Sequence, residues 1–472
     1  MRFKMDLKAS TSCVLLMCSA IPNANAEEWE LTKSISLNAA LTDNDRLTYR
    51  DEHTALDASV VPSLKLTRNS GRISANLDAQ FELSTSERDN FIPHLRSSMS
   101  AELEPGRYFI DASANITQNS TSIIRDGAVD DDSGQYNQVP ESESSTRTTV
   151  SVSPYAKYHF SDQADLLTRY TFDYSKSTGA TSSDRISNQF DANLTSGDDW
   201  SKVSWALLGQ YRQNNNTSGG NQNGFGSLDA QLGYLILPTL RATMTLGYET
   251  NDYSSSRSDN QGDRWQAGLA WFPSSRTSVN LGYGERYFGS WPAISIMHRQ
   301  RHSVFSLAYT HEVVDSDAEF TRLFLTAVDS SDPSAQPRLV ERTFTEGVYI
   351  DESLSASWML TGVRSTLNFF ARSSTKQYEN RFMPDEETKT IGSTFTRRLS
   401  PLSDFAATYS LYQQNRYQNV DTTTHSIYLS LSRQLPEDSS IALSYLFAKR
   451  NSEFEIFEYT ENRLQLSFMH QF

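Results

Sequence analysis

The last ten residues of the chain, RLQLSFMHQF (463–472), decide the fold. Side chains of an extended strand point alternately to two faces, so Leu464, Leu466, Phe468 and Phe472 share one face here. The opposite face is mostly polar. A strand of this kind belongs in a sheet that has one apolar side and one wetted side.

The N-terminal residues indicate export from the cytoplasm. Basic residues precede a short apolar run at 13–21, and the sequence NANA then ends at Ala26 with small residues two positions apart. These features predict a secretory signal peptide of residues 1–26, cleaved after Ala26. Cys18 makes a lipoprotein the alternative. Lipoprotein processing requires a small side chain before the cysteine, however, and the bulky Met17 stands there.

Composition narrows the class of the mature chain. Cys13 and Cys18 both lie in the signal peptide, so disulfides, thiol catalysis and cysteine-ligated metal are excluded. Without the four charged residues of that segment, 39 basic and 56 acidic residues remain, and this net charge of −17 argues against a nucleic-acid partner. No later segment approaches the roughly 18 to 20 apolar residues of a membrane helix, which leaves a closed β-barrel as the way to cross a bilayer.

The terminal alternation recurs along the whole chain. Apolar residues occupy every second position in a series of segments: 73–83, 166–174, 203–211, 228–236, 240–248, 265–271, 427–431 and 443–447. Short links alternate with long polar ones, of which 117–146 and 314–346 are the longest. The series predicts an all-β fold, a single antiparallel up-and-down transmembrane barrel over residues 27–472. We expect 18–22 strands, short periplasmic turns, longer extracellular loops, and both termini on the periplasmic side.

The C-terminal strand then has a second role. Leu464, Leu466, Phe468 and the terminal Phe472 resemble the signal that the barrel-assembly machinery recognises in outer-membrane proteins. The alternative is the last edge strand of a soluble β-domain. We expect an integral protein of the Gram-negative outer membrane, surrounded by lipid and lipopolysaccharide.

The inner face of the barrel is the predicted functional surface. The candidate lumen-lining residues are Arg72, Asp78, Glu82, Arg169, Asp173, Lys202, Arg212, Arg241, Arg264, Arg364, Asn368 and Arg372. A barrel of about 20 strands is roughly 40 Å wide, too wide for side chains alone to fill. Only a few residues separate Ala26 from the first candidate strand at Leu31, which leaves no room for a globular plug. Inward-folded loops, a partner protein or an open channel remain as alternatives, and the links 117–146 and 314–346 are equally interpretable as solvated surface loops.

Catalytic and metal-binding interpretations find little support. His298 and His302 share one face of a strand but lie about 13 Å apart, too far to bind one ion. The stretch GYGERYFG (282–289) looks like a phosphate loop, yet no helix pattern follows it. A Ser/His or Asp/His hydrolase pair stays open. We expect a protein that is not an enzyme and needs no metal or other cofactor.

Two segments, 280–313 and 348–378, resemble the β-barrel porin family found in exopolysaccharide gene clusters, including those associated with exosortase systems. The matching residues are Gly282, Tyr283, Gly284, Arg286, Phe288, Gly289, the basic pair Arg299 and Arg301, and strands around Tyr309 and Arg364. The two segments cover about 65 residues, and the SWP that follows Phe288-Gly289 departs from the family pattern.

This resemblance implies a channel that exports a polysaccharide of biofilm or capsule type beside a periplasmic polysaccharide-export protein. A lumen lined by Ser, Thr, Gln and Arg suits a sugar polymer, because it offers many weak and exchangeable hydrogen bonds. Inward aromatics such as Phe370 and Tyr428 either stack on sugar rings or pack under loops. A passive diffusion porin and a structural or adhesive barrel are the rival functions.

Overall fold

The computed structural model describes residues 29–45, 47–50, 52–85, 91–120, 144–179, 183–216, 222–257, 259–315, 347–379, 385–416, 420–455 and 458–472. The predicted signal peptide with Ala26, and the central parts of the links 117–146 and 314–346, lie outside these ranges. Whether those links occupy the lumen therefore stays a prediction.

The described residues form one sheet of 23 strands, of which 22 build the wall of a barrel. The remaining strand, β14, has only two residues. The strands are β1 Trp29–Thr42, β2 Ala55–Asn69, β3 Ile73–Ser84, β4 Phe91–Glu104, β5 Tyr108–Ser120, β6 Ser144–Phe160, β7 Ala164–Gly179, β8 Ser183–Ser196, β9 Val203–Asn216, β10 Gln222–Leu237, β11 Leu240–Asp252, β12 Gly262–Ser274, β13 Thr277–Arg286, β14 Gly289–Ser290, β15 Ala293–Arg299, β16 Ser303–Asp315, β17 Val348–Thr361, β18 Ser365–Tyr378, β19 Glu386–Ser400, β20 Ser403–Arg416, β21 Val420–Leu435, β22 Ser439–Ser452 and β23 Tyr459–Gln471.

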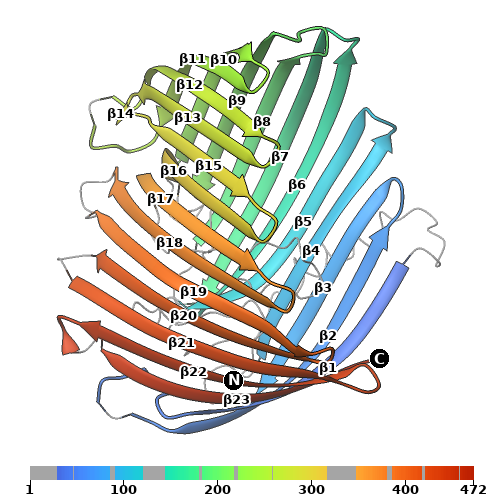
Figure 1. The fold of residues 1–472 in the computed structure, drawn as a ribbon, viewed down its shortest axis with the longest axis vertical. Coiled ribbons are helices and arrows are strands. Elements are labelled where there is room, and N and C mark those ends of the chain that lie inside the picture. Colours follow the sequence, from blue (N-terminus) through green and yellow to red (C-terminus); the bar gives the residue numbers. More distant parts are fainter. Residues whose placement is uncertain are drawn as a thin grey trace.

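Each wall strand pairs antiparallel with its neighbours in the sequence, and the last strand closes the sheet on the first (Figure 1). The pairing of β23 with β1 runs from Thr42 opposite Arg463 to Ser34 opposite Gln471. The backbone N–H of Phe472 adds a 2.8 Å hydrogen bond to the Lys33 carbonyl. The predicted single antiparallel up-and-down barrel is confirmed, and its strand number is the upper limit of the predicted range.

Connections of two kinds separate the two ends of the barrel. Short turns, such as 70–72 between β2 and β3 and 401–402 between β19 and β20, gather at one end, which we call the turn end. The longer connections gather at the other, the loop end. Most strands are longer than expected: β6 has 17 residues. An apolar band about 25 Å tall needs only about ten residues, so the wall projects beyond that band.

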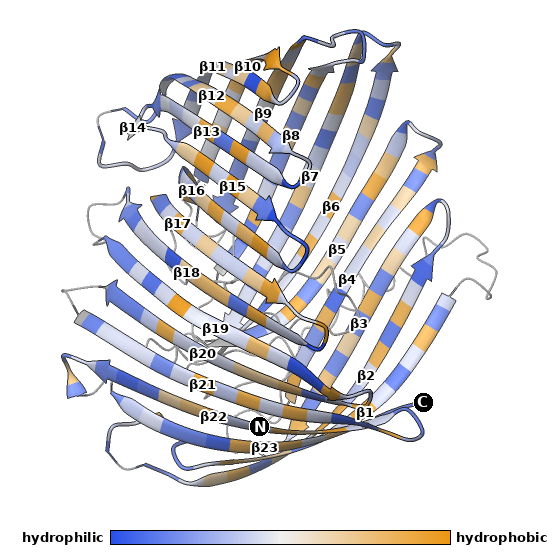
Figure 2. Ribbon diagram, in the orientation of Figure 1, coloured by the Kyte–Doolittle hydropathy of each residue, from blue (hydrophilic) through white to orange (hydrophobic). Residues whose placement is uncertain are grey.

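The outer face of the wall is apolar. Leu464 and Leu466 are 46% and 48% exposed, and alternate residues of neighbouring strands are exposed in the same way. Figure 2 shows the resulting alternation of apolar and polar bands along the strands. Aromatic pairs flank this surface: Tyr108 and Tyr158 meet near the turn end, and Phe81 and Phe91 meet near the loop end. Such girdles mark the two interfaces of a bilayer.

In the described ranges, no helix is long and apolar enough to cross a membrane.

Candidate functional site: the bore of the barrel

The strand registers show where the predicted lumen residues lie. Nine of them occupy positions that share the inner face of the wall: Asp78, Glu82, Arg169, Asp173, Arg212, Arg241, Arg264, Asn368 and Arg372. Arg72, Lys202 and Arg364 lie instead in turns at the turn end, outside the strands, and are exposed. Each of the three directly precedes the first residue of a strand, because β3, β9 and β18 begin at residues 73, 203 and 365. That these residues line a conducting pore stays a prediction.

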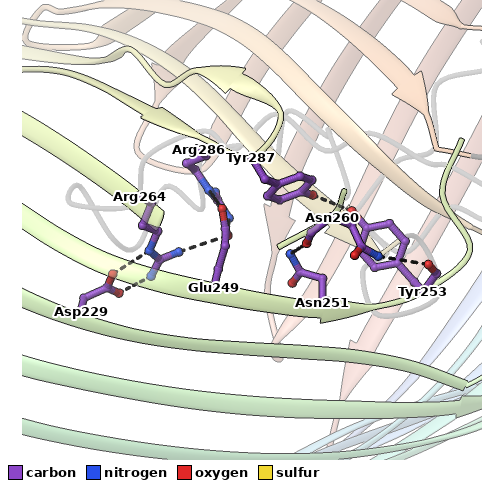
Figure 3. A network of polar contacts seen from close by, with 8 residues as sticks. All are labelled: Asp229, Glu249, Asn251, Tyr253, Asn260, Arg264, Arg286 and Tyr287. Atoms are coloured by element: carbon purple, nitrogen blue, oxygen red, sulfur yellow. Dashed lines mark hydrogen bonds and ion pairs between the residues drawn. The ribbon is translucent and has the colours of Figure 1, made fainter. Parts of the chain in front are cut away.

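Four charged side chains form a ladder on the inner face of adjacent strands (Figure 3). Arg264 on β12 donates to both carboxylate oxygens of Asp229 on β10, through Nε at 2.6 Å and through Nη2, and its Nη1 lies 3.6 Å from Glu249 on β11. Arg286 at the end of β13 donates to the other side of Glu249, with Nε 3.1 Å from Oε1. The Glu249 side chain is only 2% exposed, so its charge is balanced by two guanidinium groups rather than by water.

A glycine makes room for this ladder. Gly247 lies on β11 beside Asp229, and a Cβ added at this position would overlap the Asp229 carboxylate. Because only glycine leaves that space open, the acid can lie flat against the wall and face Arg264. In the sequence, Arg264 and Arg286 stand out only singly, and no pattern indicates the ladder, because its members come from four different strands.

The segment 282–289 folds back as a small hairpin that covers the ladder. β14 pairs with the end of β13, so Gly289 lies opposite Arg286 with a φ of +116°, a conformation that favours glycine. The hairpin brings the rings of Phe288 and Trp291 to 4.9 and 5.2 Å from the Arg286 guanidinium. Strand β15 follows the hairpin, so the phosphate-loop interpretation, which needs a helix there, does not hold.

Polar loop residues extend the network above the ladder (Figure 3). The hydroxyls of Tyr253 and Tyr287 lie 2.5 Å apart, and the Asn260 amide donates to the Tyr253 carbonyl at 3.2 Å. Burial raises the pKa of Tyr287 to about 12 and raises the pKa of Tyr253 as well. Both phenols therefore stay neutral and hydrogen-bonded at physiological pH.

Two ion pairs tie distant parts of the wall together at the loop end. Arg185 on β8 binds Asp315 at the end of β16, although β9 to β15 lie between these strands in the sheet. Asn214 on β9 donates to the same carboxylate at 2.7 Å. Arg257, in the connection from β11 to β12, binds Glu379 beyond β18 at 2.8 Å. Strands that are not neighbours in the sheet can only meet across the opening of the barrel. These contacts therefore narrow the opening at the loop end.

The inner wall is rich in hydroxyl groups. Cross-strand pairs such as Ser306–Ser357 at 2.7 Å and Thr310–Ser353 at 2.9 Å line it. A recess of about 400 Å³ opens between β3 and β7, lined by Ser74, Ser98, Ser100, Ser113, Ser151, Ser153, Thr171, Asp111, Arg169 and their neighbours. Within it Arg169 donates to Asp111 at 2.8 Å and to Ser153 at 2.9 Å. The recess offers many hydrogen-bonding groups.

The inward aromatic residue Phe370 packs against the wall. Phe370 is 6% exposed and lies opposite Gly392 on β19, where an added Cβ would overlap the ring. Its predicted packing role fits this geometry better than stacking on a sugar.

The histidines 298 and 302 do not form a site together. His298 is the last residue but one of β15, and its Nδ1 lies 2.8 Å from the Thr277 hydroxyl. His302 lies exposed in the following turn. Throughout the described ranges, no three His, Cys, Asp or Glu side chains gather as a metal site would require.

Comparison with known proteins identifies the fold. No family model matches the chain, and no curated protein sequence matches it. Solved structures do. The siderophore receptor PirA from Acinetobacter baumannii superposes with a TM-score of 0.56 at 7% identity, covering 94% of this chain and 80% of that one. The siderophore receptor PirA from Pseudomonas aeruginosa superposes with a TM-score of 0.52 at 9% identity, covering 94% of this chain and 80% of that one. The FrpB iron transporter from Neisseria meningitidis superposes with a TM-score of 0.54 at 9% identity, covering 93% of this chain and 82% of that one.

At these identities the likeness establishes the fold alone. The chain has the large β-barrel fold of outer-membrane receptors and transporters. The resemblance of residues 280–313 and 348–378 to the porin family of exopolysaccharide clusters stays a prediction.

Proposed function

We propose that the chain is an integral outer-membrane channel through which a polysaccharide leaves the cell. The turn end then faces the periplasm and the loop end faces the outside. The signal peptide, the apolar outer face and the shared receptor fold support the location. In this proposal the protein transports and catalyses no reaction.

The observation that carries the proposal is the hydroxyl-rich inner wall of the barrel. A sugar polymer exposes a donor or acceptor at almost every ring position, and it must bind weakly enough to keep moving. Paired serines and threonines, such as Ser306–Ser357 and Ser410–Ser426 at 2.5 Å, exchange hydrogen bonds readily with hydroxyls and water. The recess around Ser98, Ser113 and Ser151 offers the same groups in a concave surface.

A periplasmic polysaccharide-export protein is the partner we propose at the turn end, on the basis of the family resemblance. Assembly in the outer membrane by the barrel-assembly machinery is proposed from the C-terminal residues Phe468 and Phe472.

To test the proposal, the gene is deleted, and the polysaccharide on the cell surface and in the periplasm is measured separately. Export predicts that the surface polymer falls and that the periplasmic polymer rises, with recovery on expression of the full chain. A passive diffusion porin would leave both unchanged while conducting a steady current in planar bilayers. An adhesive barrel would keep its phenotype when the lumen is blocked and the loops are intact.

Uptake of an iron chelate is the second candidate, favoured by the fold shared with PirA and FrpB. Twenty-two-stranded transporters of that kind hold a plug in the lumen. Every described residue here belongs to the wall or to its connections. Growth of the deletion strain on ferric siderophores as the iron source, compared with the parent strain, tests this candidate.

A further inference from the structure

Exposed arginines line about half of the rim at the turn end. They occur at successive connections from β10–β11 to β19–β20 and are Arg241, Arg276, Arg299, Arg301, Arg364 and Arg397, which we call the basic arc. Arg241 and Arg299 lie at strand positions that share the inner face of the wall. Arg276, Arg301 and Arg364 lie in turns, and Arg397, opposite Phe405, lies at a strand position of the outer face.

The arginines of the basic arc lack counterions. Among the described residues, no carboxylate oxygen lies within the 4.0 Å ion-pair distance of any of the six. Arg398, next to the arc, does have such a partner in Asp404 at 3.8 Å. The ladder toward the loop end shows the opposite arrangement, because Arg264 and Arg286 are neutralised by Asp229 and Glu249. The arginines of the arc thus differ from those of the ladder in having no carboxylate partner among the described residues.

Backbone contacts bring these like charges next to one another. The N–H of Arg299 donates to the Arg276 carbonyl at 2.7 Å, and Arg397 lies opposite Ser365, the residue after Arg364. Like charges on neighbouring strands destabilise a sheet. In a chain with 57 acidic residues, counterions for these positions would be easy to supply. Their absence along the arc indicates that the positive charge has an external partner.

The rest of the same rim is mixed or acidic. Arg107 pairs with Glu104 at 3.4 Å, His159 lies 2.5 Å from Asp165, and Asp198, Asp199, Glu437 and Asp438 lie in the other turns. Phospholipid headgroups would surround the rim evenly, so they do not explain a charge confined to one side. A polyanion that enters the bore from this end would meet the arc first.

We infer that the basic arc is the entrance site for an anionic polysaccharide, a polymer that carries carboxylates or comparable acidic groups. This inference rests on the proposed export function and names its substrate class. The exposed guanidinium groups raise the local concentration of the polymer and orient it toward the bore. The hydroxyl-rich wall beyond the arc then carries it by weak contacts, and Arg264 and Arg286 of the ladder are already neutralised by Asp229 and Glu249.

The test uses the full chain in planar bilayers, with oligogalacturonate and an uncharged maltooligosaccharide of equal length as probes. Each probe is added to the turn-end side, and the rate of current-blocking events is measured at low and high salt. We expect oligogalacturonate to block about tenfold more often at low salt and to lose this advantage at high salt. Under a KCl gradient the reversal potential should show anion preference.

Two triple variants make the test specific. Arg241→Glu, Arg299→Glu and Arg364→Glu together should abolish the preference for oligogalacturonate and shift the reversal potential toward cations. The matched control combines Arg72→Glu, Arg107→Glu and Arg433→Glu, which change the charge by the same amount at rim positions outside the arc. This control should retain the preference for oligogalacturonate and the wild-type reversal potential. If the arc variant does not assemble, judged by heat-modifiable migration, the corresponding Arg→Gln triple replaces it.

Equal block by the two probes in the wild-type channel would overturn the inference, as would an arc variant that behaves like the control. Either result leaves the proposed export function standing. A normal amount of surface polysaccharide in the deletion strain would overturn the proposed export function. The preference of the channel for oligogalacturonate is measured separately in the bilayer and does not depend on that result.

Discussion

The guanidinium of Arg185 donates hydrogen bonds of 3.2 and 2.9 Å to the two carboxylate oxygens of Asp315. The two side chains are 6% and 1% exposed and come from positions 130 residues apart. This bidentate pair holds β8 and β16 together at the loop end. Bidentate geometry with little solvent gives such a pair both strength and orientation.

Breaking this tie should widen the loop-end mouth. Asp315→Asn keeps the shape of the side chain and removes the charge that Arg185 binds. We expect a loss of about 3–5 kcal/mol in the free energy of unfolding, measured in urea, because a buried charge loses its partner. Single-channel conductance in planar bilayers should rise, since the two parts of the wall are no longer held together.

The control for this experiment is an exposed pair at the same end. Arg50 and Glu455 lie 3.1 Å apart but are 77% and 64% exposed. Glu455→Gln should change stability by less than about 1 kcal/mol and leave the conductance unchanged. If Asp315→Asn matched this control in both measurements, the tie would have no structural role.

The ladder gives a second prediction about stability. Glu249→Gln removes the carboxylate shared by Arg264 and Arg286, and we expect a cost of about 3–5 kcal/mol in urea unfolding. The double variant Glu249→Leu with Arg286→Leu should cost less than the sum of its single changes, because both members of the pair then leave together. Additive losses would argue against direct coupling between the two side chains.

Local pattern was sufficient to predict the barrel. The alternation over 73–83 and 463–472 fixes which side of each strand is apolar, since a strand has a period of two. Turn and loop lengths then fix the up-and-down order, and the apolar final strand fits closure against β1. These properties depend on neighbours in the sequence, which is why they could be predicted.

The pairing of charges in the bore could not be predicted in the same way. Arg264 and Arg241 look alike in the sequence, as basic residues at alternating positions in strands. Only the fold shows that Arg264 binds Asp229, whereas Arg241 stands exposed at the rim. The tie from Arg185 to Asp315 is equally invisible, because no local pattern links two residues so far apart.

The contact between Phe370 and Gly392 predicts a rescue experiment. Gly392→Ala places a methyl group where the Phe370 ring lies, and overpacking of this kind costs about 1–3 kcal/mol in the free energy of unfolding. Adding Phe370→Ala removes the overlap with the ring, whereas the close approach of the added Cβ to the Tyr409 carbonyl oxygen, 2.6 Å, remains. The double variant should therefore regain part of the lost stability and stay somewhat less stable than Phe370→Ala alone. A double variant destabilised by the full sum of both changes would contradict the packing role of this glycine.

The terminal residue predicts a defect in assembly rather than in stability. Phe472 is 73% exposed on the outer face, so its ring adds little to the packing of the finished barrel. Phe472→Ser should therefore reduce the amount of assembled protein severalfold, measured as the heat-modifiable band in isolated outer membranes. Barrels that do assemble should unfold at nearly the wild-type urea concentration, because the backbone bond from Phe472 to Lys33 is retained. Phe454→Ser is the matched control, since Phe454 is 49% exposed but lies at the loop end, away from the C terminus. Equal amounts of assembled protein in the two variants would show that the last residue is not an assembly signal in this chain.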